Sequence, residues 1–218
     1  MNALVAYSID DNNFVLSPER VLYWEQQKTL IVADIHMGKT GHFRKSGIAV
    51  PQNVFKEDLH RLLTQVFFFK AEKLIIVGDL SHSRSNKELD LFSKWRQDMA
   101  MLKIQLVMGN HDILQEQWYK EVNILVRKKK LTIGKFDFVH DIAGHKSPPG
   151  HYIFSGHLHP GITMKGRGRQ VLQFPCFYFA NNYCILPAFS KFTGTVPVEA
   201  KKGENVFAIV ENQLLQVQ

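Results

Sequence analysis

A chain of 218 residues, 45% of them hydrophobic, is long enough to bury a sizeable core, and we expect a single domain over residues 1–218. The formal net charge of +7 favours polyanionic partners, chiefly nucleic acid, although it also fits a basic protein without such a partner. The sequence has no run of about 18 apolar residues and no signal-peptide pattern, which argues against a membrane protein. Two cysteines, Cys176 and Cys184, make no disulfide framework, so we expect free thiols in a reducing cytoplasm.

The first half of the chain alternates short apolar strands with amphipathic helices. Strand-like runs occur at 4–9, 14–16, 21–24, 29–34, 73–80 and 104–112. Apolar residues recur with helical spacing in 51–69 and 86–99, where Asn53 and either Ser85 or Asn86 are the expected N-caps. This order predicts βαβ units and a parallel sheet.

After residue 120 the pattern changes to short strands joined by short loops. We expect strands within 124–133, 136–141, 152–159, 171–180, 182–189 and 206–211. Such sequence is typical of antiparallel β-structure. An α/β half followed by a β half predicts an α/β fold in which two packed sheets are flanked by helices.

Polar residues with metal-binding side chains follow five of these apolar strands. They are Asp34 and His36, then Asp79, then Asn110 with His111 and Asp112, then His140, and finally His157 with His159. Taken singly, each is more simply a turn residue, a helix cap or a histidine at a sheet edge. Ligands of open α/β sheets bind at the carboxyl ends of the strands, so the five loops deliver these side chains to one edge. Their recurrence at the same structural place predicts a metal site.

The motifs Asp-x-His, Gly-Asp, Gly-Asn-His-Asp, His and Gly-His-x-His occur in this order between Leu30 and Pro160. This order resembles the calcineurin-like metallophosphoesterases. The stretches 33–51 and 185–194 further resemble the small bacterial branch that includes the ligase-associated DNA damage response endonuclease PdeM. The resemblance implies a four-layer α/β/β/α sandwich, a dinuclear metal centre and phosphoester hydrolysis.

Carried onto matching positions, the resemblance implies a ligand set for two divalent ions. Asp34, His36 and His159 would bind one ion, Asn110, His140 and His157 would bind the other, and Asp79 would bridge them. A donor set of imidazole, carboxylate and amide oxygen without thiolate suits Mn²⁺, iron or zinc, and we expect Mn²⁺. Two such ions would lower the pKa of bound water and attract a phosphodiester.

The chain departs from the family pattern at two places. His82 follows the Gly-Asp motif where many members carry an acidic residue or Asn, and Asp141 follows His140 where Gly is common. His145 is a rival for the fourth motif. We prefer His140 because it directly follows an apolar strand, whereas His145 lies in a Gly- and Pro-rich loop.

The catalytic residues that we expect are His111 and Asp112. His111 would donate a proton to the leaving oxygen, and Asp112 would orient its ring. The alternative is that His111 merely neighbours a ligand.

Four basic residues are candidates for substrate binding: Lys39, Arg44, Arg167 and Arg169. They lie close in sequence to the first and last motifs, so we expect contact with a nucleic-acid backbone and salt-sensitive binding.

The leading hypothesis is a metal-dependent phosphodiesterase that acts on DNA, an endonuclease of repair. The resemblance implies functional association with a DNA ligase and a helicase. Two alternatives stay open: a phosphoesterase for small nucleotides or phosphoproteins, and a non-catalytic scaffold of the same fold. Every expected ligand position is filled, which argues against the scaffold.

Overall fold

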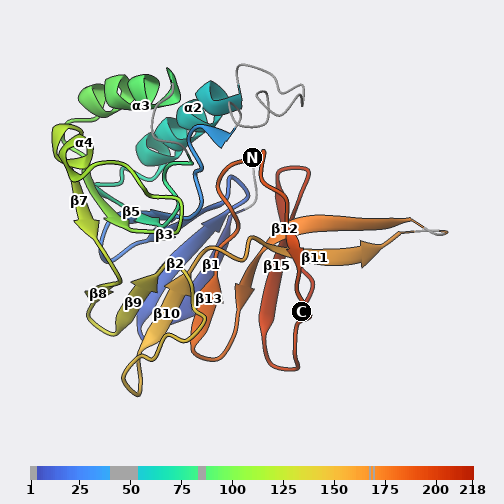
Figure 1. Ribbon diagram of the computed structural model, residues 1–218. Coiled ribbons are helices and arrows are strands. Elements are labelled where there is room, and N and C mark those ends of the chain that lie inside the picture. Colours follow the sequence, from blue (N-terminus) through green and yellow to red (C-terminus); the bar gives the residue numbers. More distant parts are fainter. Residues whose placement is uncertain (1–3, 40–53, 83–86, 167, 169) are drawn as a thin grey trace.

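The computed structural model of the chain describes residues 4–39, 54–82, 87–166, 168 and 170–218. Two β-sheets pack face to face, and the helices lie on the outer side of the first sheet (Figure 1). The predicted α/β fold with a two-sheet core is therefore confirmed. Among the described helices, none is both long enough and apolar enough to cross a membrane.

The first sheet follows the order of the chain. Within the described residues its strands are β1 (Val5–Ile9), β2 (Asn12–Ser17), β3 (Val21–Trp24), β4 (Thr29–Val32), β5 (Lys73–Val77), β6 (Lys103–Val107) and β7 (Ile124–Arg127). β1 to β4 form an antiparallel meander, whereas β4 to β7 run parallel, as predicted for β4, β5 and β6.

Two of the helices match the predicted amphipathic segments. They are α2 (Val54–Phe68) and α3 (Lys87–Asp98), and the expected caps Asn53, Ser85 and Asn86 lie outside the described residues. A third helix, α4 (Glu116–Glu121), was not predicted, because six residues are too few to show a helical repeat.

The second sheet is mixed. Its described strands are β8 (Leu131–Ile133), β9 (Phe136–Val139), β10 (Tyr152–Ser155), β11 (Pro160–Lys165), β12 (Val171–Phe179), β13 (Tyr183–Ile185), β14 (Val196–Pro197), β15 (Asn205–Val210) and β16 (Gln213–Gln216). The main path runs β14-β11-β12-β13-β10-β9-β8, and β15 pairs with β12 and β16.

The expectation that the second half is antiparallel is wrong for β7, for β10 and for the short pair of β11 and β14. The segment 124–133 divides between the sheets, since β7 lies parallel to β6 and β8 enters the second sheet. β10 lies parallel to both β9 and β13. An apolar run carries no information on strand direction, and the connection 140–151 is long enough to return the chain for a parallel strand.

Apolar side chains on both faces of β4 and β5 build the core. Leu30 and Val32 pack under the helices, whereas Ile31 faces the second sheet, and β5 alternates in the same way. Aromatic rings fill the space between the sheets, with Phe14 centred 5.5 Å from Phe136. Because both faces are covered, these strands read as continuous apolar runs.

The outer face of the second sheet carries a smaller cluster. Cys176, Tyr178, Ile185 and Val206 are buried there, with Val198 packed against them. Within the described residues, no helix forms a layer over this face. Both cysteines are free and buried, as expected, and burial raises the pKa of Cys176 to about 12.

Candidate metal centre

The carboxyl ends of β4, β5, β9 and β10 meet at one edge, where the loops that follow them are joined by backbone hydrogen bonds. Asp34 N donates to Gly78 O at 3.1 Å and His36 N to Asp79 O at 2.8 Å, which joins the loops after β4 and β5. Across the sheets, His157 N donates to Asp34 Oδ2 at 3.0 Å. This hydrogen bond thus joins the two sheets at the point where the predicted ligands converge.

The backbone is left-handed at five predicted ligands. The φ angles are 56° at Asp34, 53° at His36, 50° at Asp79, 65° at His157 and 50° at His159. For a residue with a Cβ atom this conformation costs roughly 1–2 kcal/mol, and such strain gathers at functional sites. The surrounding hydrogen bonds therefore hold these side chains in an arrangement that the chain would not adopt by itself.

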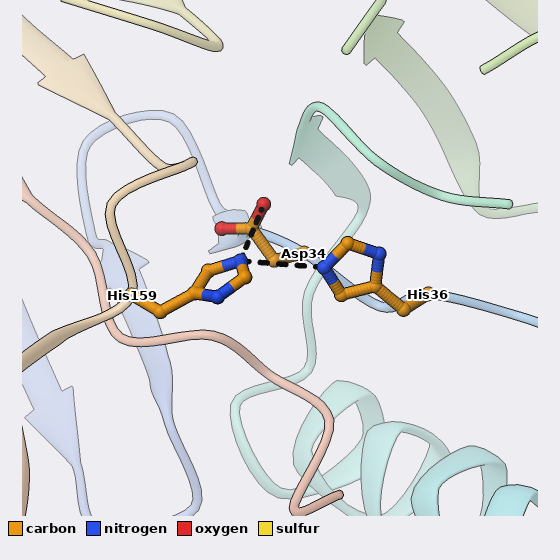
Figure 2. A group of neighbouring side chains, drawn as sticks. All are labelled: Asp34, His36 and His159. Atoms are coloured by element: carbon orange, nitrogen blue, oxygen red, sulfur yellow. Dashed lines mark hydrogen bonds and ion pairs between the residues drawn. The ribbon is translucent and has the colours of Figure 1, made fainter. Parts of the chain in front are cut away.

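A first group of donors comprises Asp34, His36 and His159. Figure 2 shows the two rings directed at each other and at the carboxylate: the Nε2 atoms of the histidines lie 3.3 Å apart, and His159 Nε2 lies 3.3 Å from Asp34 Oδ1. Asp34 is fully buried and His36 is nearly so. Lone pairs of nitrogen and oxygen converge here on a small space, as the ligands of a cation do.

A second group comprises Asp79, His140 and His157. His140 Nε2 lies 3.1 Å from His157 Nδ1 and 3.5 Å from Asp79 Oδ2. The other ring nitrogen of His140, Nδ1, lies 3.3 Å from the carbonyl oxygen of Val77. A bond from Nδ1–H to this oxygen leaves Nε2 free as a donor atom, which is the usual support of a metal-binding histidine.

The two groups adjoin. Asp79 Oδ2 lies 3.9 Å from His36 Nδ1, and Asp34 Oδ1 lies 3.9 Å from His140 Nδ1. Asp79 therefore stands between the groups, at the place where a bridging ligand is expected.

The electrostatics of the donors fit cations. Burial lowers the pKa of His36 to about 2, so its ring is neutral, and its Nδ1 is buried without a hydrogen-bond partner. Burial alone would raise the pKa of Asp79, but His140 and the backbone N–H of His111 lower it to about 2. Burial opposes protonation of His140, yet Asp79 raises its pKa to about 9. The carboxylates of the centre thus carry enough negative charge to keep the buried ring of His140 protonated. Divalent ions would supply positive charge in place of that proton.

Glycines give the ligands their space. A Cβ atom on Gly78, where φ is 81°, would lie 1.9 Å from His140 Nδ1. A Cβ atom on Gly156 would lie 2.6 Å from Asp34 Oδ2. Gly78 thus leaves room for His140, and Gly156 leaves room for Asp34. These contacts between distant parts of the chain cannot be read from a single sequence.

The turn after β6 places the carboxylate of Asp112 against backbone amides. Asp112 is buried, and its carboxylate accepts hydrogen bonds from Ser81 N at 3.0 Å and Gly109 N at 2.8 Å. Among the described residues its carboxylate makes no hydrogen bond to His111, and its predicted role in orienting that ring stays a prediction. The carboxylate turns inward because the buried amide of Ser81 and the half-buried amide of Gly109 need an acceptor.

His111 and Asn110 are exposed on the same turn. His111 N donates to Asp79 Oδ1 at 2.9 Å, and the centre of its ring lies 5.6 Å from that of His36. The side chain of Asn110 makes no hydrogen bond to another described residue. The turn therefore stands beside the donor groups, with an imidazole and an amide at its surface.

His82 borders the centre although no role was predicted for it, whereas His145, the rival for the fourth motif, lies in another network. The ring of His82 lies 4.3 Å from that of His111 and 5.7 Å from that of His36, so a further imidazole borders the centre. The sequence marked His82 only as a departure. His145 Nε2 instead lies 3.2 Å from Ser147 Oγ, in a network around Asp137. The structure thus brings His140, and not His145, into the centre.

One predicted substrate-binding residue falls within the described chain. Lys39 Nζ lies 3.2 Å from Thr193 Oγ1, on the loop after β13. Burial lowers the pKa of Lys39, while the negative charges of Asp34 and Asp79 oppose this shift. Arg44, Arg167 and Arg169 lie outside the described residues.

Residues 27–171 match the model of the calcineurin-like phosphoesterase family. The chain belongs to the calcineurin-like phosphoesterases. The family is one of hydrolases that typically bind two divalent metal ions, and the two donor groups are candidates for those sites.

Solved structures extend the comparison. The Pseudomonas putida nuclease MPE is 26% identical, with a TM-score of 0.82, over 98% of this chain and 100% of that chain. The Escherichia coli phosphoesterase Yfce is 15% identical, with a TM-score of 0.46, over 87% of this chain and 97% of that chain. Among curated proteins, none matches the sequence.

Proposed function

We propose that this protein is a dinuclear-metal-dependent phosphodiesterase that cleaves DNA as an endonuclease. The observation that carries the proposal is the pair of adjoining donor groups with Asp79 between them. The similarity to a nuclease over nearly the whole chain supports a nucleic-acid substrate. A net charge of +7 favours the same substrate.

In this proposal Asp34, His36 and His159 hold one ion, and Asn110, His140 and His157 hold the other, with Asp79 shared. The donor set contains imidazole, carboxylate and amide oxygen, which suits Mn²⁺ better than Mg²⁺ or Ca²⁺. Bound ions of this kind supply Lewis acidity toward the phosphoryl oxygens and lower the pKa of water.

Two side chains of the protein act directly on the substrate. The exposed ring of His111 donates a proton to the leaving oxygen, and the bond from His111 N to Asp79 Oδ1 holds its turn beside the centre. The ammonium of Lys39, bonded to Thr193, attracts a phosphate oxygen. Arg44, Arg167 and Arg169 are proposed to contact the backbone farther away.

The biological setting is part of the proposal. The resemblance in 33–51 and 185–194 supports a role in DNA repair, together with a DNA ligase and a helicase.

The test combines metal analysis with hydrolysis. We expect about two transition-metal ions per chain and Mn²⁺-dependent cleavage of DNA. Asp79→Asn should lose metal and reduce turnover by about 10² or more, because the shared carboxylate is removed. The matched control is Asp90→Asn, at an exposed carboxylate on α3. A folded protein without bound metal, or one that cleaves phosphomonoesters and not DNA, contradicts the proposal.

A further inference from the structure

A two-stranded arm leaves the body of the protein beside the centre. β11 and β12 pair antiparallel from Gly161 with Pro175 to Lys165 with Val171, and this part of the second sheet projects beyond its other strands (Figure 1). Pro160, the first residue of β11, directly follows His159. The arm therefore begins beside a candidate metal ligand, while the far ends of β11 and β12 extend beyond the other strands of the second sheet.

The outer half of the arm has little support from the rest of the protein. β14 pairs with Pro160 and Gly161 alone, and within the described chain residues 171–175 of β12 pair only with β11. Val171 is 58% exposed and Leu172 is 57% exposed. A two-stranded ribbon is marginally stable in water, and exposed apolar side chains on it indicate a surface for contact with a partner.

The charge of the arm indicates which partner. Lys165 is exposed at the end of β11, and Arg167 and Arg169, which lie outside the described residues, follow it within four positions of the sequence. No Asp or Glu occurs between Asp141 and Glu199, a stretch that contains the whole arm. A polyanion along the arm would thus meet the ammonium of Lys165 and no carboxylate of β11 or β12.

We propose that the β11–β12 arm binds the DNA strand at a distance from the bond that is cleaved. This inference rests on the proposed function and adds a requirement for substrate length. From Pro160 to Lys165 the strand reaches about 17 Å, at about 3.4 Å per residue. That distance is the rise of about five nucleotides along one strand of B-DNA. The preferred substrate is therefore a polynucleotide that continues about five nucleotides beyond the scissile phosphate, and not a dinucleotide.

Two variants of the arm test the proposal in the full chain. The first combines Lys165→Gln, Arg167→Gln and Arg169→Gln. The second replaces residues 165–171 with Asn-Gly, a two-residue loop that closes the hairpin at the pair Met164 and Leu172. The control combines Lys70→Gln, Lys94→Gln and Lys103→Gln, which removes the same charge from exposed lysines after α2, on α3 and at the start of β6.

Binding and cleavage give separate results. Binding of labelled single-stranded oligonucleotides of 4, 8 and 16 nucleotides is measured by fluorescence anisotropy on the metal-free full chain. We expect both arm variants to raise the Kd for the 16-mer about tenfold and to reduce the salt slope by about 2, from three lost phosphate contacts. In cleavage with Mn²⁺, the ratio of kcat/KM for the 16-mer to that for bis(4-nitrophenyl) phosphate should fall about tenfold. The control should match the unmodified protein in both.

Each remaining outcome has one meaning. If the unmodified chain cleaves DNA but the arm variants keep the same Kd, salt slope and kcat/KM ratio, the arm proposal is wrong and the proposed function stands. If the unmodified chain neither binds nor cleaves DNA, the proposed function itself is wrong. A change of oligomeric state in the arm variants, with DNA binding unaltered, would overturn the proposal in favour of a contact between copies of this chain.

Discussion

At the scale of single residues, the centre depends on glycines, which have no side chain, as well as on the candidate ligands. Gly78 precedes Asp79 in the sequence, yet the space beside its Cα atom is occupied by the ring of His140 from another strand. Its φ angle of 81° adds a second reason for glycine at this position. The Gly-Asp motif thus supports two candidate ligands: it contains Asp79, and its glycine leaves room for the ring of His140.

Gly78→Ala should displace His140 and so impair the second donor group. The added Cβ atom would lie 1.9 Å from His140 Nδ1, which no small adjustment relieves. We expect reduced metal content by elemental analysis and a fall in turnover of about 10² or more. Gly150→Ala is the matched control, because Gly150 has the same φ of 81° and nothing within 4 Å of an added Cβ atom. Equal metal loss in both variants would mean that backbone strain, and not the contact with His140, is responsible.

His111→Ala tests the proposed proton donor. The ring is exposed and is in neither donor group, so metal content should be unchanged. Turnover of DNA should fall by about 10²–10⁴, since a positioned acid is lost. The fall should be much smaller for bis(4-nitrophenyl) phosphate, whose leaving group needs no proton. Equal losses on the two substrates would argue against proton donation.

At the scale of elements, the centre is built from strand ends that hydrogen bonds hold together. Asp112 contributes to this by joining the loop after β6 to Ser81 in the loop after β5. Both loops carry predicted ligands, Asn110 and Asp79. The side chain first expected to serve His111 therefore serves the alignment of two elements.

Asp112→Ala should lower the stability of the folded protein and leave proton transfer largely unchanged. It leaves the buried N–H of Ser81 without an acceptor, at a cost of about 1–3 kcal/mol, and the loss of the acceptor for the half-buried N–H of Gly109 adds a smaller cost. Thermal unfolding should show a clearly lower Tm, and the pH profile of turnover should keep its shape. A changed pH profile with an unchanged Tm would support the role of Asp112 as a partner of His111.

At the scale of the whole molecule, the centre joins the two sheets. Asp34 follows β4 of the first sheet and His159 precedes β11 of the second, so one ion bound to both would connect the two sheets. An ion that binds only the folded state stabilises that state by mass action. The stabilisation is about 4 kcal/mol when the free ion concentration is about a thousand times the Kd.

Removal of metal should therefore lower the Tm of the intact protein. For a chain of this length, each kcal/mol corresponds to about 2–4 °C. A chelator should lower the Tm by about 10 °C, and the addition of Mn²⁺ should restore it, as followed by circular dichroism. Asp79→Asn should show little response to either treatment. A chelator response of the same size in Asp79→Asn would place the stabilising ion elsewhere.

By itself, the sequence determined the strand ends that carry ligands and the order of the motifs, because these depend on local apolar runs and on the residues that directly follow them. It also determined α2 and α3, whose apolar repeats are long enough to recognise. The sequence also favoured His140 over His145, because His140 directly follows an apolar strand. Only the tertiary structure decided the parallel direction of β10, the inward turn of Asp112 and the projection of the β11–β12 arm. These features depend on contacts between residues far apart in the chain, which local pattern does not encode.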